Sequence, residues 1–496
     1  MHFLGIDIGT SAIKAVVVDE HQAIVAQASA PVSTQQPRPG WSEQSPEDWW
    51  RATERAVAQV RSASPAAFAD VGAIGRSGQM HGLVALDAAH EVIRPAILWN
   101  DGRAVEECAT LTATVPGLAE IAGVVAMPGF TAPKLLWMRA HEPEEFARIR
   151  HIVLAKDTVR LRLTGEIVTD MADAAGTLLL DERARDWSAP ILAAVGLSRE
   201  QVPRLLEGNA PSGMLRREIA SAWGLPHPVV VAAGGGDSAA GAIGIGAFAE
   251  GDSFISLGTS AQIFVARDRY APKPATLIHA FAHALPGRWF EQAALLNGAS
   301  CLEWVARLIG EADVTLLPAR VEARFKGPSA VIFLPYLSGE RTPLNDPNAR
   351  GVFAHLEYAT GPLDLVHAVL EGVAFSLIDG QLAFGDGVRG AVPLIGGGAR
   401  SRFWMKIIAS ALGRPLRRVA HADAGPAFGA ARLARLALTG ETLESVCDKP
   451  NVEETIEPDE ALNLAYEARF ETFRALYRSL RRAREATAGS LPAATP

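Results

Sequence analysis

The chain has 496 residues, of which 49% are hydrophobic and 21% charged, and it carries a formal net charge of −8 at pH 7. That length predicts two or three domains with a sizeable core, and the acidic balance argues against general binding of nucleic acid or anionic membranes. The three cysteines lie far apart, without a Cys-x-x-Cys motif or a Cys/His cluster, so we expect no structural zinc site, no disulfide framework and a reducing cytoplasm.

The first predicted element is a hairpin at residues 4–18. An apolar run reaches Asp7, turns on Gly9-Thr10-Ser11 and becomes apolar again, which is typical of two strands and a tight turn. Gly9 allows a ligand to approach the backbone, and the N–H groups and hydroxyls of Thr10 and Ser11 can donate to phosphate oxygens. Asp7 stands at the strand end, where a carboxylate can hold a hydrated Mg²⁺. An ordinary hairpin with a solvated Asp7 fits this stretch, taken alone, equally well. Asp7 also interrupts the apolar run, so we expect no signal peptide.

Further elements are predicted up to residue 163. Strands are expected at 23–28, 71–75, 83–86, 95–98 and 151–155, and helices near 46–60, 102–114, 133–140, 144–150 and 156–163. Polar segments follow two of these strands: Gln79-Met80-His81 and Trp99-Asn100-Asp101. Donors and acceptors beside apolar faces suit a sugar or polyol, whereas a His in a glycine-flanked loop is also commonly structural.

The sharpest predicted site is the turn Gly234-Gly-Gly-Asp237 after a buried strand at 229–233. Its glycines allow close backbone approach, and the helix that follows points its N–H groups into the same space. Asp237 is therefore placed to accept a proton from a substrate hydroxyl. The alternative is that Asp237 only caps its helix, but three glycines are more than a cap requires. The same glycines and Asp237 favour a strand, turn and helix over a membrane span at 229–248.

Residues 254–266 repeat the opening hairpin with a second turn, Gly258-Thr259-Ser260. The offset between Gly9 and Gly258 is 249 residues, about half of the chain. This repeat predicts two similar halves, each presenting a turn that faces phosphate. Ser256 stands where the first copy has Asp7, so only the first half offers a metal carboxylate.

The remaining elements lie in the second half. Helices are expected near 299–309, 363–384, 401–412, 426–438 and 459–486, and strands at 331–333 and 393–395; residues 439–458 are expected to be loop, and 487–496 a frayed tail. The run Gly396-Gly397-Gly398 can pack against adenine or its ribose, although a plain strand–helix connection or a dinucleotide site also fits it. We place domain boundaries at 1–250, 251–440 and 441–496. The P-loop, H-E-x-x-H and G-x-S-x-G motifs are absent.

Four glycine turns follow one another in a characteristic order: two Gly-Thr-Ser turns with a Gly-Gly-Gly-Asp turn between them, and then a Gly-Gly-Gly-Ala-Arg turn. With these motifs the chain resembles the FGGY carbohydrate kinases from residue 4 to about residue 438. The segment Phe-Thr-Ala-Pro-Lys-Leu-Leu-Trp at 130–137 is similar to the family's signature. The segments at 78–82, 98–103, 234–237 and 333–343 are most similar to members that act on D-xylulose. A glycerol kinase would be expected to carry Arg-Glu where this chain has Met80-His81.

The resemblance implies an α/β fold in which two actin-like, ribonuclease-H-like domains flank a deep catalytic cleft. It implies ATP-dependent phosphorylation of the 5-hydroxyl of D-xylulose, giving D-xylulose 5-phosphate and ADP in D-xylose catabolism, with ATP as co-substrate and Mg²⁺. Asp237 matches the proton acceptor, and Met80 and His81 match the sugar-binding pair. Small-molecule sugar and ATP are then the expected partners, without nucleic acid or membrane, and a homodimer is expected by analogy.

The expected site residues fall into four groups. They are Asp237 for catalysis; Gln79, Met80, His81, Trp99, Asn100 and Asp101 for the sugar; Thr10, Ser11, Gly258, Thr259, Ser260, Gly396, Gly397 and Gly398 for ATP; and Asp7 for the metal. The alternatives are a kinase for L-ribulose or a polyol, a non-catalytic actin-like module that binds ATP and, more distantly, a dinucleotide oxidoreductase.

Overall fold

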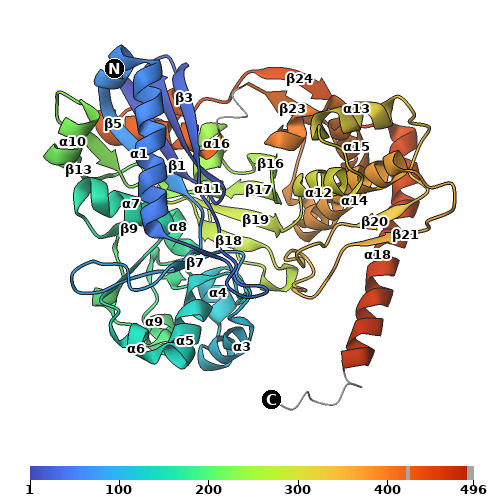
Figure 1. Ribbon diagram of the computed structural model, residues 1–496, viewed down its shortest axis with the longest axis horizontal. Coiled ribbons are helices and arrows are strands. Elements are labelled where there is room, and N and C mark those ends of the chain that lie inside the picture. The colour runs from blue at the N-terminus through green and yellow to red at the C-terminus, as the bar shows by residue number, and fades with distance from the viewer. Residues whose placement is uncertain (421–424, 489–496) are drawn as a thin grey trace.

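A computed structural model describes residues 1–420 and 425–488, which form two halves lying side by side (Figure 1). Within the described residues each half is built on a seven-stranded sheet. The first half is blue to green in Figure 1, the second yellow to red, and helix α18 runs along the outer side of the second half.

The first sheet has the order β13-β14-β5-β1-β2-β3, with β15 also pairing with β5. Its strands are β1 (His2–Ile8), β2 (Ala12–Asp19), β3 (Ile24–Pro31), β5 (Val71–Gly78), β13 (Pro211–Met214), β14 (Val230–Ala232) and β15 (Gly235–Gly236). In the parallel register, Ser77 of β5 lies opposite both Asp7 of β1 and Gly235 of β15. The carboxyl ends of these three strands therefore meet at one edge of the sheet.

The second sheet has the order β18-β19-β17-β16-β22-β23-β24. Its strands are β16 (Ser253–Leu257), β17 (Ala261–Arg267), β18 (His279–Ala282), β19 (Trp289–Leu295), β22 (Val392–Ile395), β23 (Leu416–Val419) and β24 (Val452–Ile456). Hairpin β16–β17 repeats β1–β2, but its closing pair is Leu257 and Ala261, whereas Ile8 and Ile13 close the first. The second turn is thus one residue shorter.

Most predicted helices occur within a few residues of their expected bounds. The helices of the first half are α1 (Pro46–Ala63), α2 (Pro65–Ala69), α3 (Val105–Thr114), α4 (Leu118–Ala122), α5 (Thr131–His141), α6 (Pro143–Ala147), α7 (Ala155–Thr164), α8 (Met171–Ala175), α9 (Ala189–Val195), α10 (Arg217–Trp223) and α11 (Asp237–Gly244). Those of the second half are α12 (Ser300–Leu308), α13 (Leu317–Glu322), α14 (Pro362–Ala383), α15 (Arg402–Leu412), α16 (Gly425–Thr439), α17 (Leu443–Val446) and α18 (Glu460–Ala488). Seven of these, α2, α4, α8, α9, α10, α13 and α17, were not predicted.

Short strand pairs complete the described chain. They are β4 (Glu43–Gln44) with β7 (Ala96–Ile97), β6 (Val84–Leu86) with β8 (His151–Val153), β9 (Val168–Asp170) with β12 (Arg204–Leu206), β10 (Leu180–Asp181) with β11 (Asp186–Trp187), and β20 (Ile332–Leu334) with β21 (Val352–Ala354).

The loop expected at 439–458 is wrong, because α17 and β24 form there and β24 pairs antiparallel with β23. Its acidic residues form ion pairs: Glu453 with Arg418, and Glu454 with Arg402. The acidic composition that predicted a loop is therefore balanced by basic residues distant in sequence. Of the expected tail at 487–496, residues 489–496 lie outside the described residues.

Helices α11 and α16 join the two halves through direct backbone contact. Helix α16, late in the sequence, lies among the strands of the first half (Figure 1). A Cβ atom added at Gly5 would lie 1.9 Å from the Ala427 carbonyl oxygen, and one at Gly429 only 1.7 Å from that of Ala240. Residues of α11 share a hydrophobic core with Phe254 of the second sheet. The start of α11, and hence Asp237, is consequently fixed relative to both sheets.

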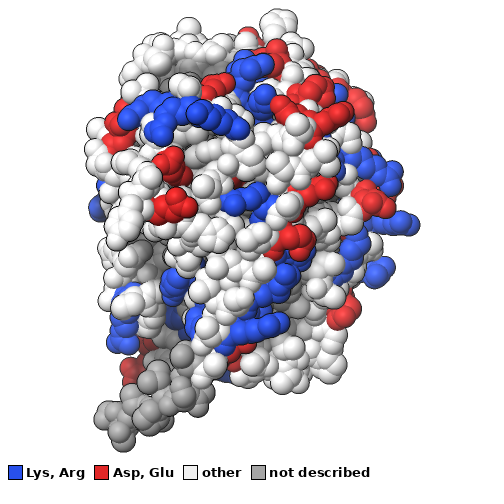
Figure 2. Space-filling view, turned by 90° about the vertical axis from the view of Figure 1, so that its right-hand side faces the viewer, with Lys and Arg blue, Asp and Glu red and all other residues white. Residues whose placement is uncertain are grey.

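Among residues 1–420 and 425–488, none of the helices combines the length and the apolar character that a bilayer span requires. Basic and acidic side chains are interspersed on the outer face of the second half (Figure 2).

We predict that Gly429→Ala lowers the free energy of unfolding by at least about 2 kcal/mol, because the new methyl group must push α11 and α16 apart. Gly241→Ala in α11 is the matched control, since its Cβ would meet only the Pro426 side chain at 4.0 Å. That control should be stabilised by about 0.5–1 kcal/mol through helix propensity. Denaturant midpoints measure both, and equal midpoints for the two variants would contradict the backbone contact.

Candidate active site

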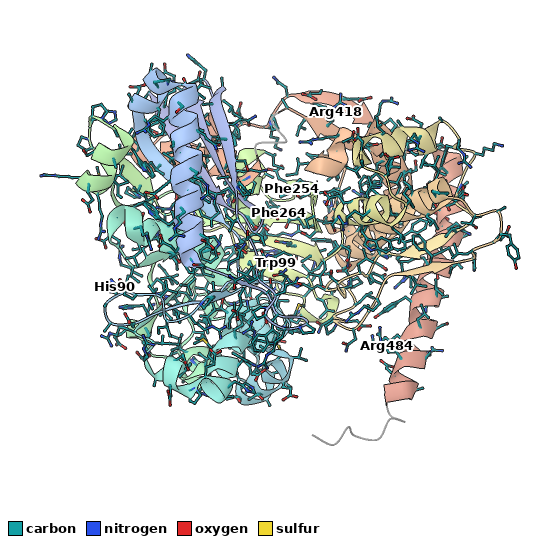
Figure 3. All side chains as sticks on the ribbon, viewed as in Figure 1. His90, Trp99, Phe254, Phe264, Arg418 and Arg484 are labelled. Carbon is teal, nitrogen blue, oxygen red and sulfur yellow. The ribbon has the colours of Figure 1, made fainter. Side chains whose placement is uncertain are left out.

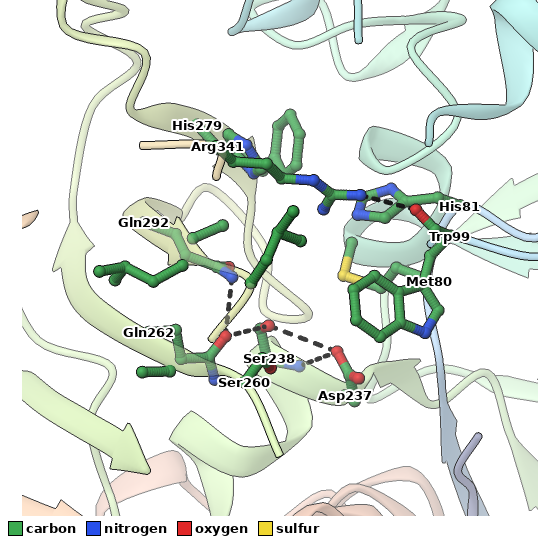
Figure 4. A pocket seen from close by; sticks show the side chains of 15 residues that line it. Met80, His81, Trp99, Asp237, Ser238, Ser260, Gln262, His279, Gln292 and Arg341 are labelled. Atoms are coloured by element: carbon green, nitrogen blue, oxygen red, sulfur yellow. Dashed lines mark hydrogen bonds between the residues drawn. The ribbon is translucent and has the colours of Figure 1, made fainter. Parts of the chain in front are cut away.

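A cavity of about 90 Å³ lies between the two halves and is lined by residues from both (Figure 4). Its lining comprises Met80, His81, Trp99, Asp237 and Ser238 from the first half, and Ser260, Ala261, Gln262, His279, Phe281, Gln292, Ala294, Leu295, Leu296 and Arg341 from the second. Trp99 lies where the halves meet, below the Phe254 and Phe264 ring pair (Figure 3). Only the two halves together form this pocket.

Asp237 and Asp7 bring two carboxylates to the edge of the first sheet. Asp237 is the first residue of α11, and its Oδ1 accepts a hydrogen bond from the Ser238 N–H at 2.7 Å. Gly236 occupies the N-cap position, so capping does not account for Asp237. Burial, and then the charge of nearby Asp7, raises the pKa of Asp237 to about 7. Burial also raises the pKa of Asp7, whose Oδ1 accepts from the Ser77 hydroxyl at 2.8 Å.

The first Gly-Thr-Ser turn is held by side chains from three elements. The Thr10 hydroxyl donates to Gln79 Oε1 at 3.1 Å and accepts from the Trp99 indole N–H at 2.9 Å. Gln44 donates to the Thr10 carbonyl at 2.6 Å. The Thr10 hydroxyl proton is thus already engaged, but the N–H groups of Thr10 and Ser11 have no acceptor among the described residues. A phosphate would meet these N–H groups and the exposed Ser11 hydroxyl.

The second turn packs directly against the Gly396 segment. Gly396 adopts φ +89°, and a Cβ there would lie 2.8 Å from the Leu257 carbonyl oxygen. The Ala299 N–H donates to the Gly258 carbonyl at 2.7 Å, and the Ser300 hydroxyl donates to that of Thr259 at 2.7 Å. The structure therefore brings together Gly258, Thr259, Ser260, Gly396, Gly397 and Gly398, the predicted ATP-side residues of the second half.

His81 is held in one orientation at the opposite wall from Ser260. It adopts φ +70°, and its Nδ1 lies 2.6 Å from the Gly176 carbonyl oxygen. Because a carbonyl only accepts, Nδ1 carries the proton and Nε2 is left as an acceptor. Burial and the nearby Arg341 charge hold the pKa of His81 well below its usual range. The His81 backbone carbonyl in turn accepts from Lys134 at 2.9 Å.

The predicted sugar residues do not all reach the cavity. Met80, His81 and Trp99 line it, whereas Gln79 lies behind them and bonds to Thr10 and Gln44. Asn100 is exposed outside the cavity lining. The Asp101 carboxylate accepts from the Ser42 N–H at 2.6 Å and from Arg103 at 2.7 and 2.8 Å. Asp101 thus ties the Arg103 loop to Ser42, and its contact with the sugar stays a prediction.

Sequence reasoning missed most of the second-half wall. Gln292 donates to Gln262 Oε1 at 2.7 Å, and that oxygen also accepts from the Ser238 hydroxyl at 3.0 Å. His279 and Gln292 lie on β18 and β19, which no motif predicted. Arg341 belongs to the segment at 333–343, which is part of the family resemblance but to which the sequence assigns no role.

Comparisons with known proteins agree with this geometry. The N-terminal and C-terminal domain profiles of the FGGY family of carbohydrate kinases match residues 2–244 and 253–438. The chain belongs to this family. The xylulose kinase of Escherichia coli (strain K12) is 46% identical over 96% of this chain and 99% of its own length, and that of Bacillus subtilis (strain 168) is 36% identical over 87% of each.

A kinase from Brucella ovis, described as a "xyloylose kinase", has a similar crystal structure, with a TM-score of 0.91 and 45% identity over 97% of this chain and all of that one. The predictions of FGGY family membership and of two actin-like α/β domains flanking a cleft are thereby confirmed.

The carboxylates at the sheet edge also fit a divalent cation. Among the described residues, neither Asp7 nor Asp237 is hydrogen-bonded or ion-paired to a basic side chain, and no cluster of three or more potential ligands occurs. Mg²⁺ needs no such cluster, because it commonly binds one or two carboxylates, waters and substrate phosphates. Asp7 is thus a suitable protein ligand for it.

We predict that kcat/KM falls about tenfold for each pH unit below about 7. Asp237, which the family resemblance implies is the proton acceptor, must be ionised in the free enzyme to play that role, and its pKa is raised to about 7. Rates measured between pH 5 and 9 test this. Asp7→Asn removes the neighbouring negative charge, so its profile should shift to lower pH. A wild-type profile flat from pH 5 to 7 would contradict the assignment.

Proposed function

We propose that this protein transfers the γ-phosphoryl group of ATP to the 5-hydroxyl of D-xylulose, giving D-xylulose 5-phosphate and ADP. The observation that carries the proposal is the Asp237 carboxylate in the wall of a cavity that both halves line, with Ser260 of the second Gly-Thr-Ser turn in the same wall. Hydride transfer would not require this arrangement, and an ATP-binding module without catalysis would not require a sugar-sized pocket.

The choice of D-xylulose rests on the relatives and on the pocket. The E. coli and B. subtilis relatives are named xylulose kinases, and the match to this chain covers most of their lengths. This agrees with the expected phosphotransferase activity on an alcohol group. Met80 and His81, which the resemblance matched to the sugar-binding pair, line the cavity beside Asp237, as does Trp99, a candidate from the polar segment at its strand end. Apolar faces and a few fixed polar atoms are what a small polyhydroxylated ligand needs.

Phosphoryl transfer depends mainly on positioning and on charge stabilisation. The free N–H groups of Thr10 and Ser11, and those of Thr259 and Ser260, which also lack acceptors among the described residues, converge on the phosphates from both halves. The 5-oxygen bonds to the γ-phosphorus while the bond to the β,γ-bridging oxygen breaks and ADP leaves. Asp237 takes the hydroxyl proton, late in a loose transition state in which that oxygen has become acidic.

Asp7 is proposed to hold Mg²⁺ through water. The ion, when bound, neutralises charge on the β- and γ-phosphates. Asp7 itself is kept in place by the Ser77 hydroxyl and by the paired strands β1 and β5.

We predict that Asp237→Asn lowers kcat by several powers of ten and changes ATP binding less than threefold, because the amide cannot accept the proton but fills the same space. Coupled ADP release measures the first quantity and calorimetric titration the second. Near-normal turnover would refute the assignment. Asn100→Ala, outside the cavity, is the matched control and should keep wild-type turnover.

A panel of ketoses, aldoses and polyols tests the substrate. Release of ADP should be fastest with D-xylulose and should vanish in Asp237→Asn. If ADP release is faster with L-ribulose or a polyol, that compound replaces D-xylulose as the proposed substrate. If ATP binds but no sugar causes ADP release, the result favours the non-catalytic module.

A cytoplasmic location and a homodimer remain part of the proposal. The three free cysteines, of which Cys301 and Cys447 are buried, support a reducing compartment. Light scattering of the purified protein measures the oligomeric state, and a monomer mass near 52.6 kDa would remove the dimer from the proposal.

A further inference from the structure

The second half contributes a basic side chain to the cavity that phosphate binding does not explain. Arg341 follows strand β20 and its loop, and its Nη2 donates to the Trp99 carbonyl of the first half at 2.6 Å. Its remaining guanidinium N–H groups have no acceptor among the described residues, and it forms no salt bridge with them. Burial lowers the pKa of Arg341 only to about 10, so it stays charged at neutral pH.

The wall around Arg341 has the chemistry of a second polar subsite. His279 is 1% exposed, lines the cavity, and has no described partner for its Nε2. Burial and Arg341 lower the pKa of His279 to about 3, so its ring is neutral. His81, whose Nε2 is an acceptor, faces the same space. Unpartnered polar atoms in a buried wall require a ligand or water to complete their hydrogen bonds.

Arg341 and Asp237 lie at opposite ends of the cavity, with Met80 between them (Figure 4). A sugar whose reacting hydroxyl meets Asp237 therefore extends its other end toward Arg341. For a 2-ketopentose phosphorylated at carbon 5, that other end carries the carbonyl group.

Sugar chemistry makes this carbonyl important. A 2-ketopentose closes its furanose ring between carbon 2 and the 5-hydroxyl, so a molecule with a free 5-hydroxyl is the open chain with a free carbonyl. Arg is a donor only, and a carbonyl oxygen is an acceptor only. Arginine and a ketose carbonyl therefore match as donor and acceptor. In the corresponding polyol, carbon 2 is tetrahedral, so its hydroxyl oxygen lies in a different direction and carries a proton of its own.

We propose that Arg341 is a specificity-determining residue that donates to the carbonyl oxygen of an open-chain ketose and so selects ketoses over the corresponding polyols. His81 Nε2 accepts from a hydroxyl next to that carbonyl. This inference rests on the proposed function and extends it, because it assigns the substrate class to a side chain of the second half.

The test compares D-xylulose with xylitol and D-arabinitol, its two reduction products at carbon 2. The readout is kcat/KM for the ketose multiplied by the competitive inhibition constant of each polyol. In Arg341→Met this product should fall about ten- to a hundredfold, the contribution of one hydrogen bond to a charged group. If Arg341 only held Trp99 in place, the substitution would weaken the binding of ketose and polyol equally. The product of kcat/KM and the inhibition constant would then stay unchanged.

Arg341→Lys covers the case in which the Met variant fails to fold. Lysine keeps the charge, but a single ammonium group does not reproduce the fork that serves the Trp99 carbonyl and the sugar together. Its product should therefore also fall, by less than in Arg341→Met. An unchanged product in a folded Met or Lys variant would overturn the inference.

Glu182→Gln is the matched control, because the Glu182 carboxylate also joins the halves, accepting from the Ala282 N–H at 2.6 Å outside the cavity lining. This variant should lower reaction rates without changing the product of kcat/KM and the polyol inhibition constant. If the wild-type protein phosphorylates no ketose, the proposed function fails by that result alone. If it does and the Arg341 variants keep their selectivity, only the present inference fails.

Discussion

Two carboxylates of like charge, Asp7 of β1 and Asp237 just after β15, are held near one another at the ends of two strands that pair with opposite sides of β5. Such an arrangement is unfavourable in a partly dehydrated site: burial and the charge of Asp7 raise the pKa of Asp237, and burial raises the pKa of Asp7. It persists because the in-register strands β1, β5 and β15 leave the side chains no other place. The roles proposed for Asp7 and Asp237, in cation binding and in proton transfer, thus fall on two carboxylates that the fold itself brings together before any substrate arrives.

The two halves supply complementary chemistry to the cavity. In the cavity wall the first half presents acceptors, the Asp237 carboxylate and Nε2 of His81, and its first turn adds the free N–H groups of Thr10 and Ser11. The second presents donors: the Arg341 guanidinium and the free N–H groups of Thr259 and Ser260. The proposed substrates, a polyhydroxylated sugar and a polyphosphate, offer hydrogen-bond partners to both sides.

Features encoded locally could be predicted from the sequence. The Gly-Thr-Ser turns, the Gly-Gly-Gly-Asp turn and helix starts such as Pro46 depend on residues within a few positions of one another. Gln44, His279 and Gln292 could not be predicted, because their roles depend on partners 30 or more residues away, such as Gln79 for Gln44 and Gln262 for Gln292.

Polar composition misled the prediction at residues 439–458. Glu453 and Glu454 favoured a loop there because the basic residues that pair with them belong to other elements. For Asp101 the sequence could not show that its carboxylate also accepts from Ser42 and Arg103. Single-sequence patterns reveal which side chains are polar and leave open which of them already have partners.

The position of α16 has a consequence for the order in which the chain matures. The face of the first sheet that bears Phe3, Val16, Val18 and Ala73 is covered by Ala427, Phe428, Ala431 and Ala434 of this helix. A nascent chain therefore carries an uncovered apolar sheet face until the ribosome has passed Thr439, long after the sheet's own strands have emerged. We therefore expect the first half to expose this apolar face during most of synthesis, and a chain that ends before residue 425 to be prone to aggregation.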